Sequence, residues 1–157
     1  MSAAVVAAAA RALGAGVAAA EPVAGGDINR ALRLRLDDGR TLFVKHRPDA
    51  PAGMYAAEAD GLSWLAAGDG GLRLPAVAAV GEEDGARFLA LEWIERGRPG
   101  DGYDERLGRG LAALHAAGAP AFGLERDNWI GSLPQRNAPA PTWAAFYGER
   151  RLAPLAR

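Results

Sequence analysis

Residues 41–62 read TLFVKHRPDAPAGMYAAEADGL, and this stretch decides the fold. Residues 41–46 are rich in side chains that favour strands, whereas apolar residues recur at helical spacing over 51–67. Lys45 lies on the predicted strand, and Glu58 follows thirteen residues later near the middle of the predicted helix. Lys45 is also the only lysine, because the other 17 of the 18 basic residues are arginine. The stretch therefore predicts a strand that carries the only lysine and a following helix that carries Glu58.

The lone lysine and the glutamate after it suggest an ion pair. A helix packed across a sheet would bring the Glu58 carboxylate to the Lys45 ammonium, as in protein-kinase-like enzymes, and would hold a positive charge where nucleotide phosphates lie. Lysine supplies a compact point charge there, whereas arginine supplies a planar fork. The alternative is a surface lysine beside an ordinary helix glutamate, and the pair alone does not decide between the two.

The rest of the chain predicts short strands with few helices between them. The predicted elements are an alanine-rich helix ending near Gly14, a strand end and turn at 23–27, a strand at 28–36, a hairpin turn at 37–40, the strand 41–46, the helix 51–67, strands at 74–80 and 88–94, a helix at 104–117, a loop at 120–141 and a helix from 142. In strand 28–36, one face is formed by Ile28, Leu32, Leu34 and Leu36. Short antiparallel strands with one inserted helix predict an α+β fold rather than a doubly wound parallel sheet.

Composition excludes several classes of protein. The chain has 157 residues, a net charge of −1 and no cysteine, and 50% of its residues are hydrophobic. This length fits one domain, or one and a fraction. A near-neutral charge argues against a nucleic-acid partner, which needs a basic surface. Without cysteine there is no disulfide scaffold, thiolate zinc site or cysteine nucleophile, although histidine or carboxylate metal sites stay open.

Targeting and membrane signals are weak. The apolar run at 3–10 has no basic residue before it and consists mainly of alanine, so we expect a helix and not a signal peptide. The longest stretch free of charged residues, 110–124, is shorter than the roughly 18 residues that a membrane span requires. We expect a cytoplasmic protein with no membrane partner.

Short motifs follow one another in a specific order. They are Gly25–Asn29, Phe43–His46, Met54–Leu62, Leu91–Ile94, Leu111–His115, Phe122–Gly123 and the most specific one, Asp127–Asn137, followed by Trp143, Phe146 and Arg150–Leu152. Together they resemble the ketosamine (fructosamine) kinases, relatives of the aminoglycoside phosphotransferases, over nearly the whole chain from Val23 onward. The resemblance implies a protein-kinase-like N-lobe, with an antiparallel sheet of about five strands and one αC-type helix, plus the first helices of the C-lobe. The nucleotide-binding N-lobe and its N-terminal helix would occupy residues 1–95, and the hinge exit and the incomplete substrate-binding C-lobe residues 96–157.

The resemblance also implies a nucleotide site. Lys45 would contact the α- and β-phosphates of ATP, and Glu58 would orient it. Gly25 and Gly26 would form the turn over the phosphates, although a plain hairpin turn is the alternative, because the chain has neither GxGxxG nor GxxxxGK[ST]. The hinge that pairs its backbone with the adenine edge would consist of Glu92, Trp93 and Ile94.

On the sugar-substrate side, the resemblance implies roles for Asn128, Gln135 and Asn137. Polar turn residues that cap their own loop are the alternative for these three. His115 lies on an Ala/Leu helix face, and we expect it to be a buried structural histidine rather than a catalytic base. In the last helix, three residues are expected in the core: Trp143, Phe146 and Leu152. Arg150 and Arg151 are expected at a solvated helix end.

Phosphoryl transfer in this fold needs further groups. An aspartate orients the acceptor hydroxyl, and Asp or Asn side chains bind Mg²⁺. In the family resembled, these come from a His-Gly-Asp-type loop and a later aspartate, but His46 precedes Arg47 and His115 precedes Ala116. We expect no catalytic residue and no metal ligand in this chain, and a base downstream of Arg157. Residues 1–157 alone should be inactive and prone to self-association through bare helix faces.

The sequence thus favours one function over two others. It predicts a phosphotransferase that uses Mg²⁺ and ATP to phosphorylate a sugar hydroxyl of a ketosamine on an amine or a glycated protein, which is protein deglycation. One alternative is another small-molecule kinase of the aminoglycoside or choline kinase type. The other is a non-catalytic nucleotide-binding or interaction module.

Overall fold

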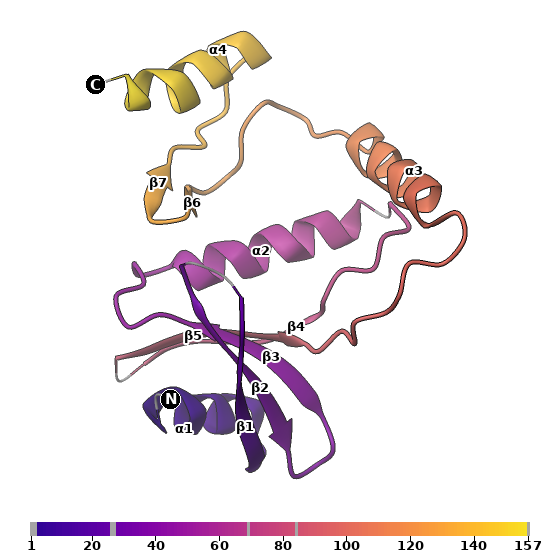
Figure 1. Ribbon diagram of the computed structural model, residues 1–157. Helices are drawn as coiled ribbons and strands as arrows, with labels where there is room; N and C mark the ends of the chain where they lie inside the picture. The colour runs from indigo at the N-terminus through magenta and orange to yellow at the C-terminus, as the bar shows by residue number, and fades with distance from the viewer. Residues whose placement is uncertain (1–2, 26–27, 69, 84, 157) are drawn as a thin grey trace.

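A five-stranded antiparallel sheet with the order β1-β2-β3-β5-β4 forms the centre of the protein (Figure 1). The computed structural model describes residues 3–25, 28–68, 70–83 and 85–156. The sheet strands are β1 (Val17–Val23), β2 (Arg30–Leu36), β3 (Thr41–His46), β4 (Val77–Glu83) and β5 (Ala86–Glu92). Helix α1 (Ala3–Leu13) precedes the sheet, and α2 (Met54–Ala67) is inserted between β3 and β4. The predicted α+β fold is confirmed.

The turn between β2 and β3 forms as its sequence predicts. Gly39 has a φ of 89°, which a side chain with a Cβ rarely adopts. The backbone N–H of Leu36 donates to the carbonyl of Arg40 at 2.9 Å, and Asp38 accepts from the Arg40 backbone at 3.0 Å. This turn sets the β2–β3 register in which Ala31 lies opposite Lys45.

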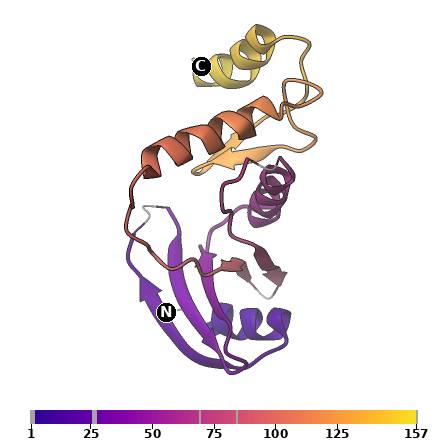
Figure 2. The same ribbon diagram turned by 90° about the vertical axis from the view of Figure 1, so that its right-hand side faces the viewer.

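The sheet has a core on each face. On one face, α1 covers a cluster that contains Leu32, Leu34, Leu36, Leu42, Val44, Phe88 and Ala90. On the other face, α2 packs Met54 and Tyr55 against Leu89 and Leu91 of β5. Figures 1 and 2 show the sheet between these two helices. Strand β5 is therefore buried on both faces, as its nearly continuous apolar run predicts.

The segment after β5 forms smaller elements. They are α3 (Tyr103–Ala116), the hairpin strands β6 (Asn128–Ile130) and β7 (Leu133–Gln135), α4 (Trp143–Tyr147), a π-helical turn (Gly148–Leu152) and a 3₁₀ turn (Ala153–Leu155). They lie beyond α2, at the end of the molecule opposite α1 (Figures 1 and 2). No helix among the described residues is long and apolar enough to cross a membrane.

Four details of the predicted elements were wrong. Ile28 lies outside β2 and is exposed, because the strand begins only at Arg30. The strands predicted at 74–80 and 88–94 run instead from Val77 to Glu83 and from Ala86 to Glu92. The segment predicted as a plain loop contains the β6–β7 hairpin, whose turn places Gly131 at a φ of 62°.

The predicted burial of the last elements was also partly wrong. His115 is exposed on α3, where it lines an open hollow that Trp64 of α2 and Trp143 of α4 also line. Trp143 and Leu152 are more than half exposed, and only Phe146 of the expected trio is buried. The Trp143 ring instead stacks on Tyr147, with 5.2 Å between the ring centroids. The apolar side chains of α3 and α4 therefore lie largely open, as expected for these helices, with Phe146 as the exception.

Candidate nucleotide-binding site

The ion pair inferred from the sequence forms in the structure. The Lys45 Nζ donates to both carboxylate oxygens of Glu58 at 2.8 Å. Alternation along β3 buries Val44 and His46 on the α1 face and turns Lys45 to the α2 face, where the second turn of α2 presents Glu58. The two side chains are 20% and 34% exposed, so the pair is partly desolvated and still accessible. Two N–H···O bonds to one carboxylate fix the position of the ammonium.

The start of α2 is held by two other elements. The backbone N–H of Gly53 donates to the Glu82 carboxylate of β4, at 2.8 and 3.1 Å. A carboxylate at this end also interacts favourably with the helix dipole. Trp129 of β6 packs against the same side of the α2-face core. Glu82 and Trp129 thus fix the helix that carries Glu58.

One turn before Glu58, Tyr55 reaches a different strand. Its ring is fully buried, and its hydroxyl donates to the Asn29 Oδ1 at 2.9 Å. Burial raises the pKa of Tyr55 to about 12, because the phenolate would lose its hydration. Asn29 directly precedes β2 and follows the predicted phosphate turn, in which Gly25 has a φ of 116°. Gly26, the second glycine predicted for that turn, lies outside the described residues.

The predicted hinge begins at Glu92, the last residue of β5, and continues into Trp93 and Ile94. The backbone N–H of Glu92 donates to the Ala76 carbonyl at 2.8 Å, and that of Trp93 donates to Thr41 at 3.4 Å. The Glu92 carboxylate accepts from Arg73 at 2.5 Å and from the Ala76 backbone at 3.3 Å. These two hydrogen bonds lower the pKa of Glu92, and the one from Arg73 has the larger effect. Two hinge N–H groups are therefore bonded within the protein, and contact of residues 92–94 with a base stays a prediction.

The Trp93 side chain belongs to the same face of the sheet as Lys45. Its ring lies 6.4 Å from that of Phe43, two residues before Lys45, and the Arg33 guanidinium stacks over it at 4.7 Å. Glu95 pairs with Arg33 at 3.3 Å. In the described part of the chain, the buried Trp93 Nε1 and Arg33 Nε have no hydrogen-bond partner. Both nitrogens are covered by the surrounding protein, and the stacked Arg33–Trp93 pair is further fixed by the Glu95 ion pair.

The structure brings the three predicted substrate-side residues into one hairpin. Asn128 and Gln135 are partners across β6 and β7, and the buried Asn137 follows β7. The Asn137 amide donates to the Asn128 Oδ1 at 2.9 Å and to the Arg126 carbonyl at 3.1 Å. Its backbone N–H donates to Asp127 at 2.8 Å. Asn137 thus bonds within its own loop, whereas a contact of Asn128 or Gln135 with substrate stays a prediction.

Arg151 is not at a solvated helix end, as the sequence suggested. Its guanidinium donates to the Asn137 Oδ1 at 2.5 Å and to the Arg136 carbonyl at 2.7 Å. It also stacks over Phe146 at 4.7 Å. Arg151 therefore connects the last helical turns to the hairpin loop.

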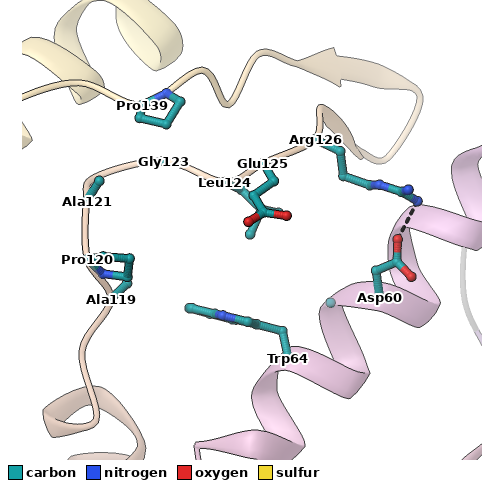
Figure 3. Close-up of a pocket in the computed structure, with 11 residues that line it drawn as sticks. Asp60, Trp64, Ala119, Pro120, Ala121, Gly123, Leu124, Glu125, Arg126 and Pro139 are labelled. Atoms are coloured by element: carbon teal, nitrogen blue, oxygen red, sulfur yellow. Dashed lines mark ion pairs between the residues drawn. The ribbon is translucent and has the colours of Figure 1, made fainter.

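A hollow of about 390 Å³ lies between α2 and the chain segment that follows α3 (Figure 3). Trp64 points from α2 into it, toward Pro120 on the chain segment that follows α3. An ion pair between Asp60 and Arg126 closes one end. The hollow includes none of the residues predicted to bind nucleotide or substrate.

The described residues also contain no cluster of three or more His, Cys, Asp or Glu side chains that could bind a metal ion. Sequence reasoning missed Tyr55, Asn29 and Glu82 as parts of this site. The two motifs containing Tyr55 and Asn29 were recognised, but nothing in them signals a hydrogen bond 26 residues apart along the chain.

Comparisons with known proteins identify the family of this chain. The family described as fructosamine kinase matches residues 1–157. The chain is 38% identical over 131 residues to a probable ketoamine kinase of Enterococcus faecium, covering 83% of this chain and 45% of that protein. It is 38% identical over 133 residues to a chloroplastic protein-ribulosamine 3-kinase of Arabidopsis thaliana, covering 83% of this chain and 40% of that protein. The crystal structure of a putative fructosamine-3-kinase from Thermobifida fusca superposes with a TM-score of 0.79 at 42% identity, covering 96% of this chain and 51% of that one. The chain thus spans about half the length of these relatives.

Proposed function

The chain belongs to the fructosamine kinase family, and on that basis we propose that it forms the ATP-binding part of an enzyme that phosphorylates ketosamines. The enzyme would transfer the γ-phosphoryl group of Mg·ATP to a sugar hydroxyl of a ketosamine on an amine or a glycated protein. We place this activity in the cytoplasm. The relatives named above are ketoamine, ribulosamine and fructosamine kinases, which supports this substrate class.

The observation that carries the proposal is the Lys45–Glu58 pair. Both carboxylate oxygens bind the ammonium at 2.8 Å, on the face of the sheet that α2 covers. In this arrangement the lysine offers its charge to the α- and β-phosphates, and the glutamate keeps it from swinging away. An ordinary surface pair would not need the only lysine of the chain.

The other residues of this face would form the rest of the nucleotide site. The turn at Gly25 and Gly26 would lie over the phosphates, and Glu92, Trp93 and Ile94 would line the base. The Trp93 ring lies beside Phe43 on the same face as Lys45, which supports a base at that end. Mg²⁺ would neutralise phosphate charge when bound, and we propose that its ligands lie outside this chain. Asn128 and Gln135 would face the sugar.

The test is to replace Lys45 with alanine in the protein expressed from the complete gene. Phosphorylation of a fructosyl-lysine peptide and of a ribulosyl-lysine peptide is followed with Mg·ATP. We expect a loss in turnover of about 10²-fold or more, because positioned charge provides most of the catalysis in phosphoryl transfer. The melting temperature should change little, since partly exposed ion pairs contribute only about 1 kcal/mol or less.

The matched control is Arg109→Ala, which breaks an exposed ion pair with Glu105 on α3. This variant should keep full turnover. Unchanged turnover in Lys45→Ala would remove the pair from the mechanism. Absence of ATP-dependent phosphorylation of both peptides in the unaltered protein would exclude the proposed substrate class.

A further inference from the structure

Two side chains on one face of α2 reach two neighbouring strands. Glu58 binds Lys45 in β3, and Tyr55, one helical turn earlier, binds Asn29 just before β2. Ala31 of β2 lies directly opposite Lys45 in the sheet, so Asn29 is two residues from that pair. A single helix face therefore contacts both the proposed phosphate-binding lysine and the end of the proposed phosphate turn.

The Tyr55 hydroxyl has a role that packing does not require. The ring is fully buried in the cluster with Met54 and Leu89, where a phenylalanine would fill nearly the same space. A buried hydroxyl costs free energy unless it is hydrogen-bonded, and Asn29 provides its acceptor at 2.9 Å. The bond thus joins a core residue of α2 to a half-buried residue at the start of a strand.

The helix end that carries Tyr55 is held firmly. Two residues away, the Gly53 N–H is bound by the Glu82 carboxylate, and Trp129 packs against the same cluster. The chain on the Asn29 side has less support, since Ile28 is exposed and the strand ladder begins only at Arg30. The hydrogen bond therefore connects a well-supported helix end to Asn29, which has less support.

We propose that Tyr55 is a positioning residue that, through Asn29, holds the start of β2 beside Lys45 where the phosphates of ATP bind. The proposal rests on the proposed function, because it assumes that a nucleotide binds at Lys45. It implies that one motion of α2 displaces both the lysine pair and Asn29. Nucleotide affinity should then depend on a hydroxyl that does not itself touch the nucleotide.

The test uses Tyr55→Phe, Asn29→Ala and the double variant in the protein expressed from the complete gene, with Tyr103→Phe as the matched control. Tyr103 is an exposed tyrosine at the start of α3. Each single variant should raise the KM for Mg·ATP about fivefold with kcat within about twofold, the size expected from one neutral hydrogen bond. The double variant should be no worse than either single one, because both remove the same bond. The control should keep its KM.

A second measurement does not need turnover. Amide hydrogen exchange of residues 28–32, recorded without nucleotide, should be faster in Tyr55→Phe and in Asn29→Ala, and unchanged in Tyr103→Phe. If Tyr55 had only a structural role, Tyr55→Phe would lower the melting temperature. The exchange of residues 28–32 would then stay unchanged, and the KM for Mg·ATP would not rise at constant kcat. Asn29→Ala keeps the test decisive if Tyr55→Phe does not fold.

The outcomes separate the two proposals. If Lys45→Ala abolishes turnover while Tyr55→Phe and Asn29→Ala leave the KM for Mg·ATP unchanged, the positioning role is wrong and the proposed function stands. If Lys45→Ala has no effect either, both are wrong. In a protein without turnover, unchanged exchange of residues 28–32 in Tyr55→Phe overturns the inference by itself.

Discussion

The two halves of the chain bury their apolar side chains very differently. Among the described residues, every buried hydrophobic side chain except Phe146 lies between Val5 and Leu91. Helix α2 and helix α3 have the same length, but α2 buries four residues against the sheet, whereas α3 buries only Gly110. The apolar residues of α3 repeat at helical spacing, and Leu107 and Leu111 are nevertheless exposed. An amphipathic helix is thus buried only where a second layer exists to receive it.

The second half is joined to the first by a few specific contacts. Arg126 pairs with Asp60 on α2, and Trp129 packs beside the α2-face core. Asn137 and Arg151 then connect the hairpin to the last turns by hydrogen bonds. The first half has two buried apolar clusters, whereas the second is held by these polar contacts and by aromatic contacts around Trp143. The two should therefore respond differently to the same kind of substitution.

The largest expected contrast is between two leucines. Leu34→Ala removes a fully buried side chain from the α1-face core and should cost about 2–5 kcal/mol of unfolding free energy, because a cavity remains. Leu111→Ala, on the open face of α3, should cost less than about 1 kcal/mol. Urea unfolding of the two variants measures both values. Equal losses would mean that α3 is packed in solution and would contradict the difference in burial between the two halves.

A smaller, local effect is expected for Asn137→Ala. The substitution removes the hydrogen bonds of the Asn137 amide to the Arg126 carbonyl, Asn128 and Arg151, at a cost of about 1–3 kcal/mol in the hairpin region. Hydrogen exchange should quicken over residues 126–151 while the sheet stays protected. Ser132→Ala, at the exposed hairpin turn, is the control and should change neither. A parallel loss of protection in the sheet would show that the two halves unfold together.

The smallest effect concerns His46, the buried histidine at the end of β3. Burial, and secondarily the charge of Arg30, lower the pKa of His46 from 6.5. The unfolded chain then binds more protons than the folded one below pH 6.5, so stability falls as the pH drops from there toward the folded pKa. The slope cannot exceed about 1.4 kcal/mol per pH unit for one proton. His46→Phe should flatten this part of the curve, whereas His115→Gln, at the exposed histidine of α3, should keep it. An unchanged slope in His46→Phe would contradict the assignment.

The sequence by itself determined the sheet, the inserted helix and the Lys45–Glu58 pair. Side chains that alternate along β2 and β3 point to opposite faces of the sheet, and apolar residues at helical spacing define one face of α2. These are local patterns, and together they leave the lone lysine and the glutamate on facing surfaces. The ordered motifs also identified the family, because their number and spacing are more specific than any one of them.

Only the tertiary structure decided what each ordinary side chain contacts. Tyr55 and Asn29 lie 26 residues apart, and Arg151 and Asn137 lie 14 apart, with nothing in their types to pair them. The same holds for burial, since His115 lies on an apolar-looking helix face and is nevertheless exposed. Local patterns predict which face of an element is apolar, whereas burial and hydrogen bonding depend on which other element packs against that face. That is why the fold and the lysine pair followed from the sequence, and the contacts of Tyr55 did not.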